Sequence, residues 1–398
     1  MRLRCLECHR EGPVDPTRWR CQCGGLLEIT GGPCFDPARV DADAHTLWRY
    51  REALPLPDGA KPVTLGEGWT PLVDVEWNGQ LVRFKAESLN PTGSFKDRGA
   101  ALLVTALKAA GVREVVEDSS GNAGAALSAY AARGGLDATV YVPAHASPVK
   151  QAQIAVYGAH IVAIPGSRSD TAAAVLQAVD RGAVYATHAY SPFYPHGMKT
   201  VAYELWEQCG GCAPQGIVVP VGHGGLLLGL HCGFGELLSA GLIRRWPRLV
   251  GVQAEACAPL ARAWERGASA VESVAEGETI AGGVRIAAPP WGRQVLAAVR
   301  ETDGAIVALS DEAALAARDK LARRGLYVEP TSALAVAALD HLRQSAGEPL
   351  ARRGLYVEPT SALAVAALDH LGRSLGETPV VVLTGSGFKS PPQMSRVS

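Results

Sequence analysis

Short apolar runs alternate with amphipathic stretches along the chain from about residue 80 onward, and glycine- or serine-rich turns separate them. An apolar run bounded by turn residues predicts a buried strand, and periodic apolar positions after the turn predict a helix. Strand–turn–helix units are clearest in residues 113–135, 138–166, 216–234 and 249–267. Their succession predicts an α/β fold with mostly parallel sheets covered by helices. Active sites in such sheets lie at the carboxyl ends of the strands, so the turns that follow them are the places to search.

Composition and charge narrow the class of protein. The 398 residues are 47% hydrophobic, which is enough for the cores of two or three domains and excludes a disordered chain. A net charge of −1 gives no sign of a nucleic-acid or membrane partner, and the most apolar stretch, GGLLLGLHCGFGELL, is too short to span a bilayer. The segment MRLRCLECHR lacks the apolar part of a secretory signal, so nine cysteines indicate thiols or metal ligands in a reducing, cytoplasmic setting.

Residues 1–34 carry a separate cysteine pattern. Two closely spaced pairs are separated by twelve residues, and two glycines follow the second pair, as a tight metal-binding knuckle requires. Four thiolates suit tetrahedral Zn²⁺, so we expect a structural zinc ribbon; the alternative is a ribbon-shaped module that has lost its metal. The predicted ligands are Cys5, Cys8, Cys21 and Cys23. The pair Cys209 and Cys212 has no partner pair nearby, which favours a loop over a redox site.

The chain contains an internal duplication within residues 321–371. The segment LARRGLYVEPTSALAVAALDHL occurs at Leu321–Leu342 and again, without change, at Leu350–Leu371, an offset of 29 residues. Solenoid repeats diverge and come in three or more copies, whereas two identical copies indicate an in-frame tandem duplication. One position in a fold holds one copy, so the other is predicted to be extra, and the sequence does not decide which.

A lysine stands at a turn-to-helix junction in the segment NPTGSFKDRGA. Ser94 and Asp97 have the spacing of a capping box, which predicts a helix that starts here and ends at Gly111. Lys96 then lies in the first helical turn, where the positive end of the helix dipole lowers the pKa of a cation. Only a neutral amine attacks a carbonyl, so Lys96 is a candidate for Schiff-base chemistry; the alternative is a solvated surface lysine.

Three further turns follow predicted strands. In SSGNAG, Asn122 is suited to donate to a phenolate oxygen, although an ordinary helix cap accounts for it as well. In PVGHGG, backbone N–H groups converge at a helix start and form a nest for a phosphate, without the dinucleotide fingerprint. In LTGSG, Thr384 ends a buried strand, where a neutral hydroxyl suits an aromatic nitrogen; the alternative is a simple strand-to-loop turn. The glycines of the nest are Gly222, Gly224 and Gly225.

One ligand accounts for all four sites. It has an aldehyde for Lys96, a ring oxygen for Asn122, a phosphate for the glycine nest and a ring nitrogen for Thr384. That combination predicts pyridoxal 5′-phosphate as the cofactor.

With these motifs the sequence resembles the threonine synthase family, within the fold-type II pyridoxal-phosphate enzymes (the tryptophan synthase β-like superfamily). NPTGSFKDRG is the most specific of the matching segments, which run in order along nearly the whole chain. They are LGEGWTPL (65–72), NPTGSFKDRG (90–99), SSGNAG (119–124), PVGHGG (220–225), VEPTSA (328–333 or 357–362) and LTGSG (383–387).

The resemblance implies an architecture of two open parallel-sheet α/β domains with an N-terminal zinc-ribbon-like module, and a homodimer. We expect the active site in the cleft between the two α/β domains. The predicted divisions are 1–45 for the ribbon-like module, 46–105 with 197–398 for the large cofactor domain, and 106–196 for the small domain.

The resemblance also implies an activity and roles for individual residues. Threonine synthases eliminate phosphate from O-phospho-L-homoserine and add water, so the implied enzyme is a lyase with a small amino-acid substrate. Lys96 would bind the cofactor aldehyde and act as acid and base, Asn122 would face the pyridine O3′ and Thr384 the ring nitrogen. The implied cofactor-phosphate loop is Gly222, His223, Gly224 and Gly225, and the implied substrate-carboxylate loop is Ser119, Ser120 and Gly121.

One segment, THAYSPFYPHGMKT, departs from the family pattern of an Asn/Ser pair followed, after a proline, by an arginine. The residues found there instead are His188, Ala189, Phe193 and Tyr194. An arginine fork is the natural clamp for a phosphate, so its absence counts against a phosphorylated substrate. Lys199, here assigned to substrate binding, and His196 or His223 are the compensating candidates, although each is equally an ordinary surface or core residue.

The sequence leaves alternatives open. A β-eliminating or β-replacing enzyme acting on Ser, Thr or Cys, like threonine dehydratase, shares the same cofactor elements. A catalytically weak cofactor-binding homologue is a second alternative, because the duplication lies within the cofactor domain. A nucleic-acid role for the arginine-containing ribbon is disfavoured by the neutral charge and the scarcity of aromatic residues.

Overall fold

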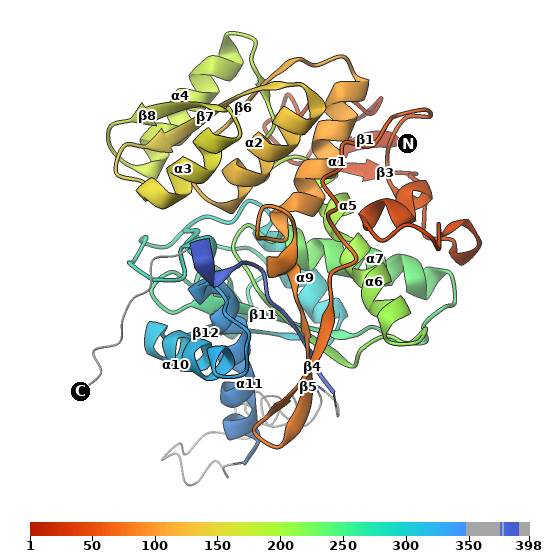
Figure 1. Ribbon diagram of the computed structural model, residues 1–398, viewed down its shortest axis with the longest axis vertical. Helices are drawn as coiled ribbons and strands as arrows, with labels where there is room; N and C mark the ends of the chain where they lie inside the picture. Colours follow the sequence, from red (N-terminus) through yellow and green to blue (C-terminus); the bar gives the residue numbers. More distant parts are fainter. Residues whose placement is uncertain (348–374, 376–377, 390–398) are drawn as a thin grey trace.

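The computed structural model describes residues 1–347, 375 and 378–389. Within them, the strands form three sheets, and Figure 1 places the two larger sheets in its upper and lower halves. No helix of this described part is long and apolar enough to cross a membrane. The predicted α/β class with two parallel sheets and a separate N-terminal module is confirmed.

The smaller α/β unit contains a fully parallel sheet. Its strands lie in the order β8-β7-β6-β9, and the apolar runs that predicted them supply the buried Val115, Val140 and Val142. Its elements are β6 (Glu114–Glu117), α2 (Asn122–Gly134), β7 (Asp137–Pro143), α3 (Pro148–Val156), β8 (His160–Ile164), α4 (Arg168–Asp180) and β9 (Val184–Tyr185).

The larger sheet has the order β12-β11-β10-β13-β5-β4, and all neighbours are parallel except the edge pair β4–β5. Asn78 and Gly79 join that pair with positive φ values of 51° and 75°, as a tight hairpin turn requires. Its strands are β4 (Leu72–Trp77), β5 (Gln80–Lys85), β10 (Gly216–Pro220), β11 (Arg248–Ala254), β12 (Ala305–Leu309) and β13 (Val380–Val382).

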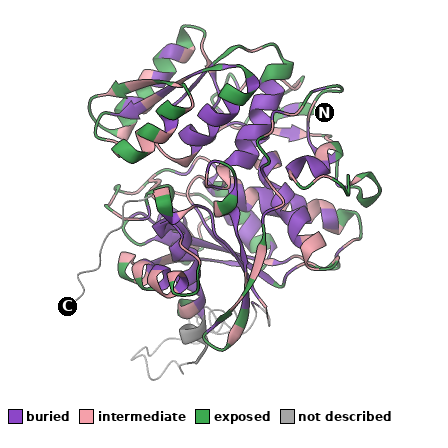
Figure 2. Ribbon diagram, viewed as in Figure 1, coloured by how far each residue is buried: buried purple, intermediate pink, exposed green. Residues whose placement is uncertain are grey.

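Helices of this unit pack around the larger sheet, and Figure 2 shows buried residues concentrated where helices meet strands. Every residue of β10 is buried, as expected of a central parallel strand covered on both faces. The helices are α5 (Phe193–Met198), α6 (Thr200–Gln208), α7 (Gly225–Ser239), α8 (Pro259–Glu265), α9 (Gly292–Glu301), α10 (Asp311–Ala322) and α11 (Pro330–Gly347). Helix α1 (Lys96–Ala109) packs against α5 and against α2 of the smaller unit.

The N-terminal module is a small antiparallel sheet of β1 (Arg2–Cys5), β2 (Glu11–Gly12) and β3 (Leu27–Thr30), in the order β2-β1-β3. Short 3₁₀ turns connect it to the larger unit or follow later strands and helices. They are η1 (Pro37–Arg39), η2 (Leu47–Ala53), η3 (Glu87–Leu89), η4 (Gly282–Val284) and η6 (Gly387–Lys389).

The first copy of the duplicated segment occupies a defined place in the fold. Residues 321–342 contain the end of α10 and most of α11, with Leu334, Val336 and Leu342 in the core of the larger unit. The second copy, at 350–371, lies outside the described residues. The structure therefore seats the first copy beside β13.

Candidate active site

Lys96 is the first residue of α1 and lines a cavity of about 320 Å³. Its amine lies 4.7 Å from the centre of the Phe95 ring and 5.9 Å from that of Tyr194. Burial lowers the pKa of Lys96 to about 8, because desolvation outweighs the attraction of Glu117 and Glu329. The predicted direction of the pKa shift is confirmed, and its main cause is burial rather than the helix dipole.

The predicted capping box is wrong. Ser94 Oγ is buried without a hydrogen-bond partner, and α1 begins with no side-chain cap. The Asp97 carboxyl instead turns back to Thr92, accepting from its backbone N–H at 2.7 Å and from its hydroxyl. The acidic residue thus fixes the turn that precedes the helix, which holds the lysine in place by a different contact from the one expected.

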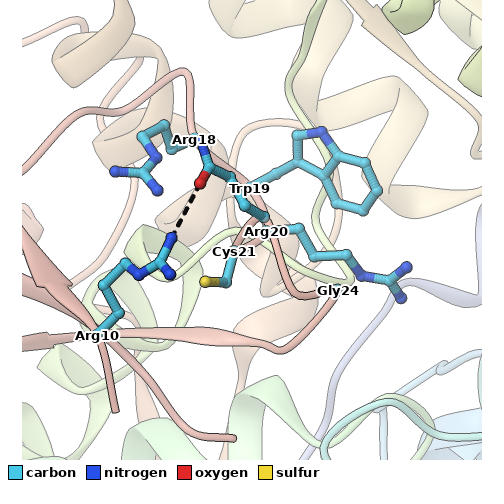
Figure 3. A pocket seen from close by; sticks show the side chains of 7 residues that line it. Arg10, Arg18, Trp19, Arg20, Cys21 and Gly24 are labelled. Carbon is cyan, nitrogen blue, oxygen red and sulfur yellow. Dashed lines mark hydrogen bonds between the residues drawn. The ribbon is translucent and has the colours of Figure 1, made fainter. Parts of the chain in front are cut away.

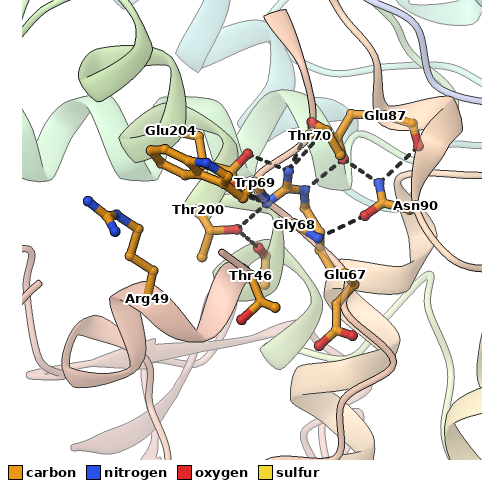
Figure 4. Close-up of polar contacts among 12 residues, drawn as sticks. Thr46, Arg49, Glu67, Gly68, Trp69, Thr70, Glu87, Asn90, Thr200 and Glu204 are labelled. Carbon is orange, nitrogen blue, oxygen red and sulfur yellow. Dashed lines mark hydrogen bonds and ion pairs between the residues drawn. The ribbon is translucent and has the colours of Figure 1, made fainter. Parts of the chain in front are cut away.

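A buried ionic cluster fixes the start of α1 to the larger sheet. The Arg98 guanidinium donates to both carboxylate oxygens of Glu87, at 2.6 and 2.7 Å, and also pairs with Glu204 of α6. Lys85 donates to the same Glu204 at 2.6 Å. Figure 4 shows Glu87 and Glu204 directed toward one point between their elements. The charges of the two glutamates and of the two basic side chains compensate each other in a site that is buried from solvent. Because Arg98 is two residues after Lys96, the cluster also holds the first turn of α1 in place.

The turn between β6 and α2 brings its polar residues to the same cavity. Ser119, Ser120, Gly121 and Asn122 all line it. Asn122 is the first residue of α2 and its side chain does not cap the helix. Its amide donates to Glu329 at 3.2 Å and its carbonyl accepts from Lys389 at 3.0 Å. Asn122 therefore lines the cavity with its amide held between Glu329 and Lys389.

The turn between β10 and α7 brings the glycines of the predicted anion nest to the cavity. Gly222, His223, Gly224 and Gly225 line the cavity at the start of a 15-residue helix. Gly224 has a φ of +99°, which a side chain rarely adopts. A Cβ placed on Gly225 would meet no atom within 4 Å, so the space above the nest is open. Converging N–H groups at a helix start provide a site for a phosphate.

Thr384 follows β13, the strand beside β10 in the larger sheet, and lines the same cavity as the nest. Its hydroxyl lies 3.1 Å from Ser332 Oγ and 3.4 Å from Glu329 Oε1, and the residue is buried. A buried amine, an open anion nest and a neutral hydroxyl around one cavity fit pyridoxal phosphate. The predicted cofactor residues are thus brought together by turns from both sheets.

Comparisons with known proteins agree with this set of side chains. The sequence profile described as "Pyridoxal-phosphate dependent enzyme" matches residues 63–349, more than half of the chain. The chain belongs to this family. It is 35% identical to a threonine synthase of Methanocaldococcus jannaschii over 347 residues, 84% of this chain and 85% of the relative. It is 38% identical to a threonine synthase of Mycobacterium leprae over 291 residues, 71% and 78% of the two chains.

Solved structures give the same fold. A threonine deaminase from T.th. superposes with a TM-score of 0.63 at 27% identity, covering 81% of this chain and 94% of that chain. This pyridoxal-phosphate-dependent enzyme is therefore related to the threonine synthases in sequence and has the fold-type II architecture. The predicted resemblance is confirmed.

Three basic side chains at the cavity of this pyridoxal-phosphate enzyme were not singled out from the sequence. Lys150 of α3, Arg168 of α4 and Arg285 line it. Arg285 pairs with Glu276 at 3.1 Å, whereas no ion pair joins Lys150 or Arg168 to another described residue. Arg168 begins α4, and the turn before it follows the strand β8, as the turns with Asn122, Gly222 and Thr384 follow strands. This position after a strand was the sequence signal that could have identified Arg168. The cavity therefore carries cations beyond those of the cofactor site.

Lys199 and His196 do not lie at the cavity. The Lys199 amine is buried and pairs with Glu236 of α7 at 2.7 Å. His196 is half-buried, and its Nδ1, which solvent does not reach, has no hydrogen-bond partner among the described residues. Neither side chain lines the cavity, so of the three compensating candidates only His223 does. The structure thus corrects the assignment of Lys199 to the substrate.

The four predicted metal ligands converge in the N-terminal module. Sγ atoms of Cys5, Cys8, Cys21 and Cys23 all lie within 4.8 Å of one another. The backbone N–H groups of Glu7 and Cys8 donate to Cys5 Sγ at 3.4 and 3.5 Å. Any side chain at Gly25 would come within 2.7 Å of the same sulfur. The cluster fits a tetrahedral thiophilic cation. Cys209 and Cys212 lie at the end of α6 and in the following loop, as expected.

The module also contacts the small α/β unit. Trp19 packs edge-on against Tyr185 and Tyr190, with ring centres 5.2 and 5.5 Å apart, and the Arg20 guanidinium lies 4.6 Å from the Tyr190 ring. Figure 3 shows Trp19 directed away from Arg10 and Arg18, which border a separate shallow cavity of about 520 Å³. The ring contacts join the cysteine module to the turn that follows β9.

Proposed function

We propose that this enzyme converts O-phospho-L-homoserine and water into L-threonine and inorganic phosphate. The threonine synthase relatives support the activity, and the cavity charge supports the substrate. Lys150 and Arg168 reach a cavity that already contains an anion nest for the cofactor. A substrate with a carboxylate and a phosphate supplies two further anions. This surplus of cations is the observation that carries the proposal.

Each cavity residue has a defined task in this reaction. Bound pyridoxal phosphate supplies an electron sink for carbanion charge on the substrate. Lys96 Nζ, with a pKa of about 8, takes a proton from a substrate carbon and returns one at near-neutral pH. The neutral hydroxyl of Thr384 and the amide of Asn122 would hold the cofactor ring. The rings of Phe95 and Tyr194 shield the amine from water.

A second candidate is β-elimination from a hydroxy amino acid. The threonine deaminase at 27% identity supports it, together with Tyr194 at the place where the resemblance leads one to expect a phosphate-binding arginine. Such a substrate brings one carboxylate to the cations Lys150 and Arg168, whereas O-phospho-L-homoserine brings a carboxylate and a phosphate. The charge argument therefore favours the phosphorylated substrate.

Purified enzyme supplied separately with O-phospho-L-homoserine, L-threonine and L-serine separates the candidates. The proposal expects phosphate and threonine in equal amounts from the first substrate. Formation of 2-oxo acid from L-threonine or L-serine, without phosphate release from O-phospho-L-homoserine, would establish the second candidate. Absence of all products from a protein that binds the cofactor would indicate the catalytically weak homologue.

Substitution of Arg168 tests the cation that carries the proposal. We expect Arg168→Met to raise KM for O-phospho-L-homoserine at least about tenfold, because a charge-assisted hydrogen bond contributes roughly 1.5–3 kcal/mol. Steady-state phosphate release measures it. Arg181→Met is the matched control, since Arg181 is exposed at the other end of α4. An unchanged KM for Arg168→Met would remove the charge argument.

For the N-terminal cluster we propose one structural Zn²⁺ bound by the four thiolates. The convergence of the sulfur atoms, the N–H groups directed at Cys5 and the side-chain-free Gly25 support a closed tetrahedral site. All four positions are filled by cysteine, so the ion has no open place for a substrate. The site contributes to folding rather than to the reaction.

A further inference from the structure

Glu117 and His188 meet at the carboxyl ends of neighbouring strands. Glu117 is the last residue of β6, and β9 runs parallel beside it, with Tyr185 opposite Val116. The backbone N–H of Ala186 extends this pairing to Val116 at 2.9 Å. His188 therefore follows next to Glu117, and its Nδ1 lies 2.7 Å from Glu117 Oε1. Both side chains are buried, and His188 lines the cavity that contains Lys96.

Burial favours the uncharged state of both side chains. Burial lowers the pKa of His188 well below its ordinary value and raises the pKa of Glu117 well above its own. Glu117 then carries a proton on Oε1 and donates it to Nδ1 of a neutral imidazole. The other oxygen, Oε2, is buried without a partner, which costs far less for a neutral acid than for a carboxylate.

This arrangement determines what His188 presents to the cavity. With Nδ1 accepting from Glu117, the ring hydrogen is on Nε2, the nitrogen that remains for a ligand. The charged and titratable groups around the ring, besides Glu117, are Lys96, Arg168, His223 and Tyr194. Among these surroundings an imidazolium is disfavoured, so the ring is a neutral donor rather than a fixed cation.

We propose that His188 donates its Nε2 proton to the leaving oxygen of the substrate and that Glu117 replaces this proton through Nδ1. The inference rests on the proposed function. Lys96 removes a proton from the carbon next to the C–O bond, and the electron pair of that C–H bond forms the C=C bond. The C–O bond breaks with its electron pair on oxygen, which takes the proton from Nε2. The proton of Glu117 moves to Nδ1 and leaves a carboxylate, which is reprotonated after product release.

The leaving group explains the need for such a donor. The phosphate ester group of the substrate is a dianion at neutral pH. If the C–O bond broke without protonation, the leaving group would be the phosphate trianion, which is strongly basic. One proton delivered to the bridging oxygen converts it to hydrogen phosphate. General acid catalysis of this kind contributes about 10²–10⁴ in rate. Glu117 acts through His188 and is a positioning residue that also stores the proton.

The test compares two substrates that differ in their need for a proton, O-phospho-L-homoserine and L-2-amino-4-chlorobutanoate. His188→Gln should lower kcat about 100-fold with the phosphate ester and change it less than about threefold with the chloride, because chloride leaves unprotonated. Glu117→Gln keeps a donor to Nδ1 but stores no transferable proton. The Glu117→Gln variant should lose less kcat than His188→Gln, and again lose it with the phosphate ester rather than with the chloride. Its kcat should also depend on pH differently from that of the wild type.

The controls separate a chemical role from a structural one. His231→Gln alters a matched histidine–glutamate pair, because His231 Nε2 lies 2.9 Å from Glu301 on the surface; both substrates should be unaffected. Visible absorbance of the bound cofactor confirms that each variant is folded, and His188→Asn replaces His188→Gln if that variant does not fold. An equal loss with both substrates would overturn the inference. Failure of the wild type to release phosphate would overturn the proposed function, and this inference with it.

Discussion

The amine of Lys96 gains its reactivity from burial, which places the pKa at about 8 instead of 10.5. Protonated amine does not attack an aldehyde, so each pH unit below 8 lowers the reactive fraction about tenfold. We expect the rate at which cofactor-free enzyme takes up pyridoxal phosphate to rise with pH and level off above about 8. The growth of visible absorbance after mixing measures it.

Lys96→Arg should show no such absorbance at any pH, because a guanidinium forms no Schiff base with the aldehyde under these conditions. A rate that keeps rising to a midpoint near 10.5 would mean that the amine is solvated in the absence of cofactor. The assignment of the pKa shift to burial would then be wrong.

Residues that stand at strand ends within a local motif were predictable from the sequence. Asn122 and Thr384 each follow a run of apolar residues that predicts a strand, and parallel strands bring their carboxyl ends together. Lys96 was recognisable from its turn-to-helix motif, NPTGSFKDRG. Lys199 was misassigned because its direction depends on Glu236, which is 37 residues away on α7. Arg168 was missed because a single cation at the start of a helix has no distinctive spacing.

At the scale of elements, a substitution at the N-terminus of α7 can weaken cofactor binding without weakening the fold. A methyl group at Gly225 meets no protein atom within 4 Å and improves helix propensity, so Gly225→Ala should not lower the thermal midpoint of the cofactor-free protein. The added methyl group occupies the space above the nest, where the cofactor phosphate would lie. We therefore expect the dissociation constant for pyridoxal phosphate to increase at least about tenfold, the equivalent of one lost hydrogen bond. Absorbance titration measures it.

Gly224→Ala gives the contrasting result. Its φ of +99° and the Cγ2 atom of Val295, 2.5 Å from the added Cβ, make this substitution destabilising before any cofactor is added. If Gly225→Ala left the affinity for pyridoxal phosphate unchanged, the phosphate would have to lie elsewhere than at this helix.

Helix α1 was predictable from the sequence, but the contacts at its first turn were not. The helix and its end near Gly111 follow from propensity and glycine punctuation. Its first turn does not, because Asp97 bonds to Thr92 and Arg98 binds Glu87 across sequence distances that a capping pattern does not describe. Tertiary contacts replaced the local cap and at the same time fixed the orientation of Lys96.

At the scale of the whole molecule, the duplication shows that identical sequence does not fix position. VEPTSA occurs twice, and only the packing of 328–333 against β13 decides which copy supplies Glu329 to the cavity. The contact between the cysteine module and the small unit was likewise not predictable, because Trp19 has no pattern that connects it with Tyr185 and Tyr190.

The contact of Trp19 with Tyr185 links the cysteine module to the turn that follows β6. Tyr185, which packs on Trp19, donates its hydroxyl to Asp118 at 2.7 Å, and Asp118 precedes Ser119 at the cavity. Aromatic pairs of this kind contribute about 0.5–1.5 kcal/mol each beyond their burial. Loss of the module's structure therefore removes support from the turn that contains His188.

Removal of zinc should accordingly act at a distance. We expect the purified protein to contain one zinc per chain, and Cys8→Ser or a strong chelator to remove it and lower the thermal midpoint by several degrees, because about 1–3 kcal/mol of ring contacts is lost. Hydrogen exchange of the amides in 185–190 should rise in the same samples. Cys212→Ser is the matched control, since Cys212 belongs to the other C-x-x-C pair and lies outside the cluster. Zinc loss that leaves the exchange of these amides unchanged would show that Trp19 holds the turn without help from the metal, and a Trp19→Ala variant would then be the one to release it.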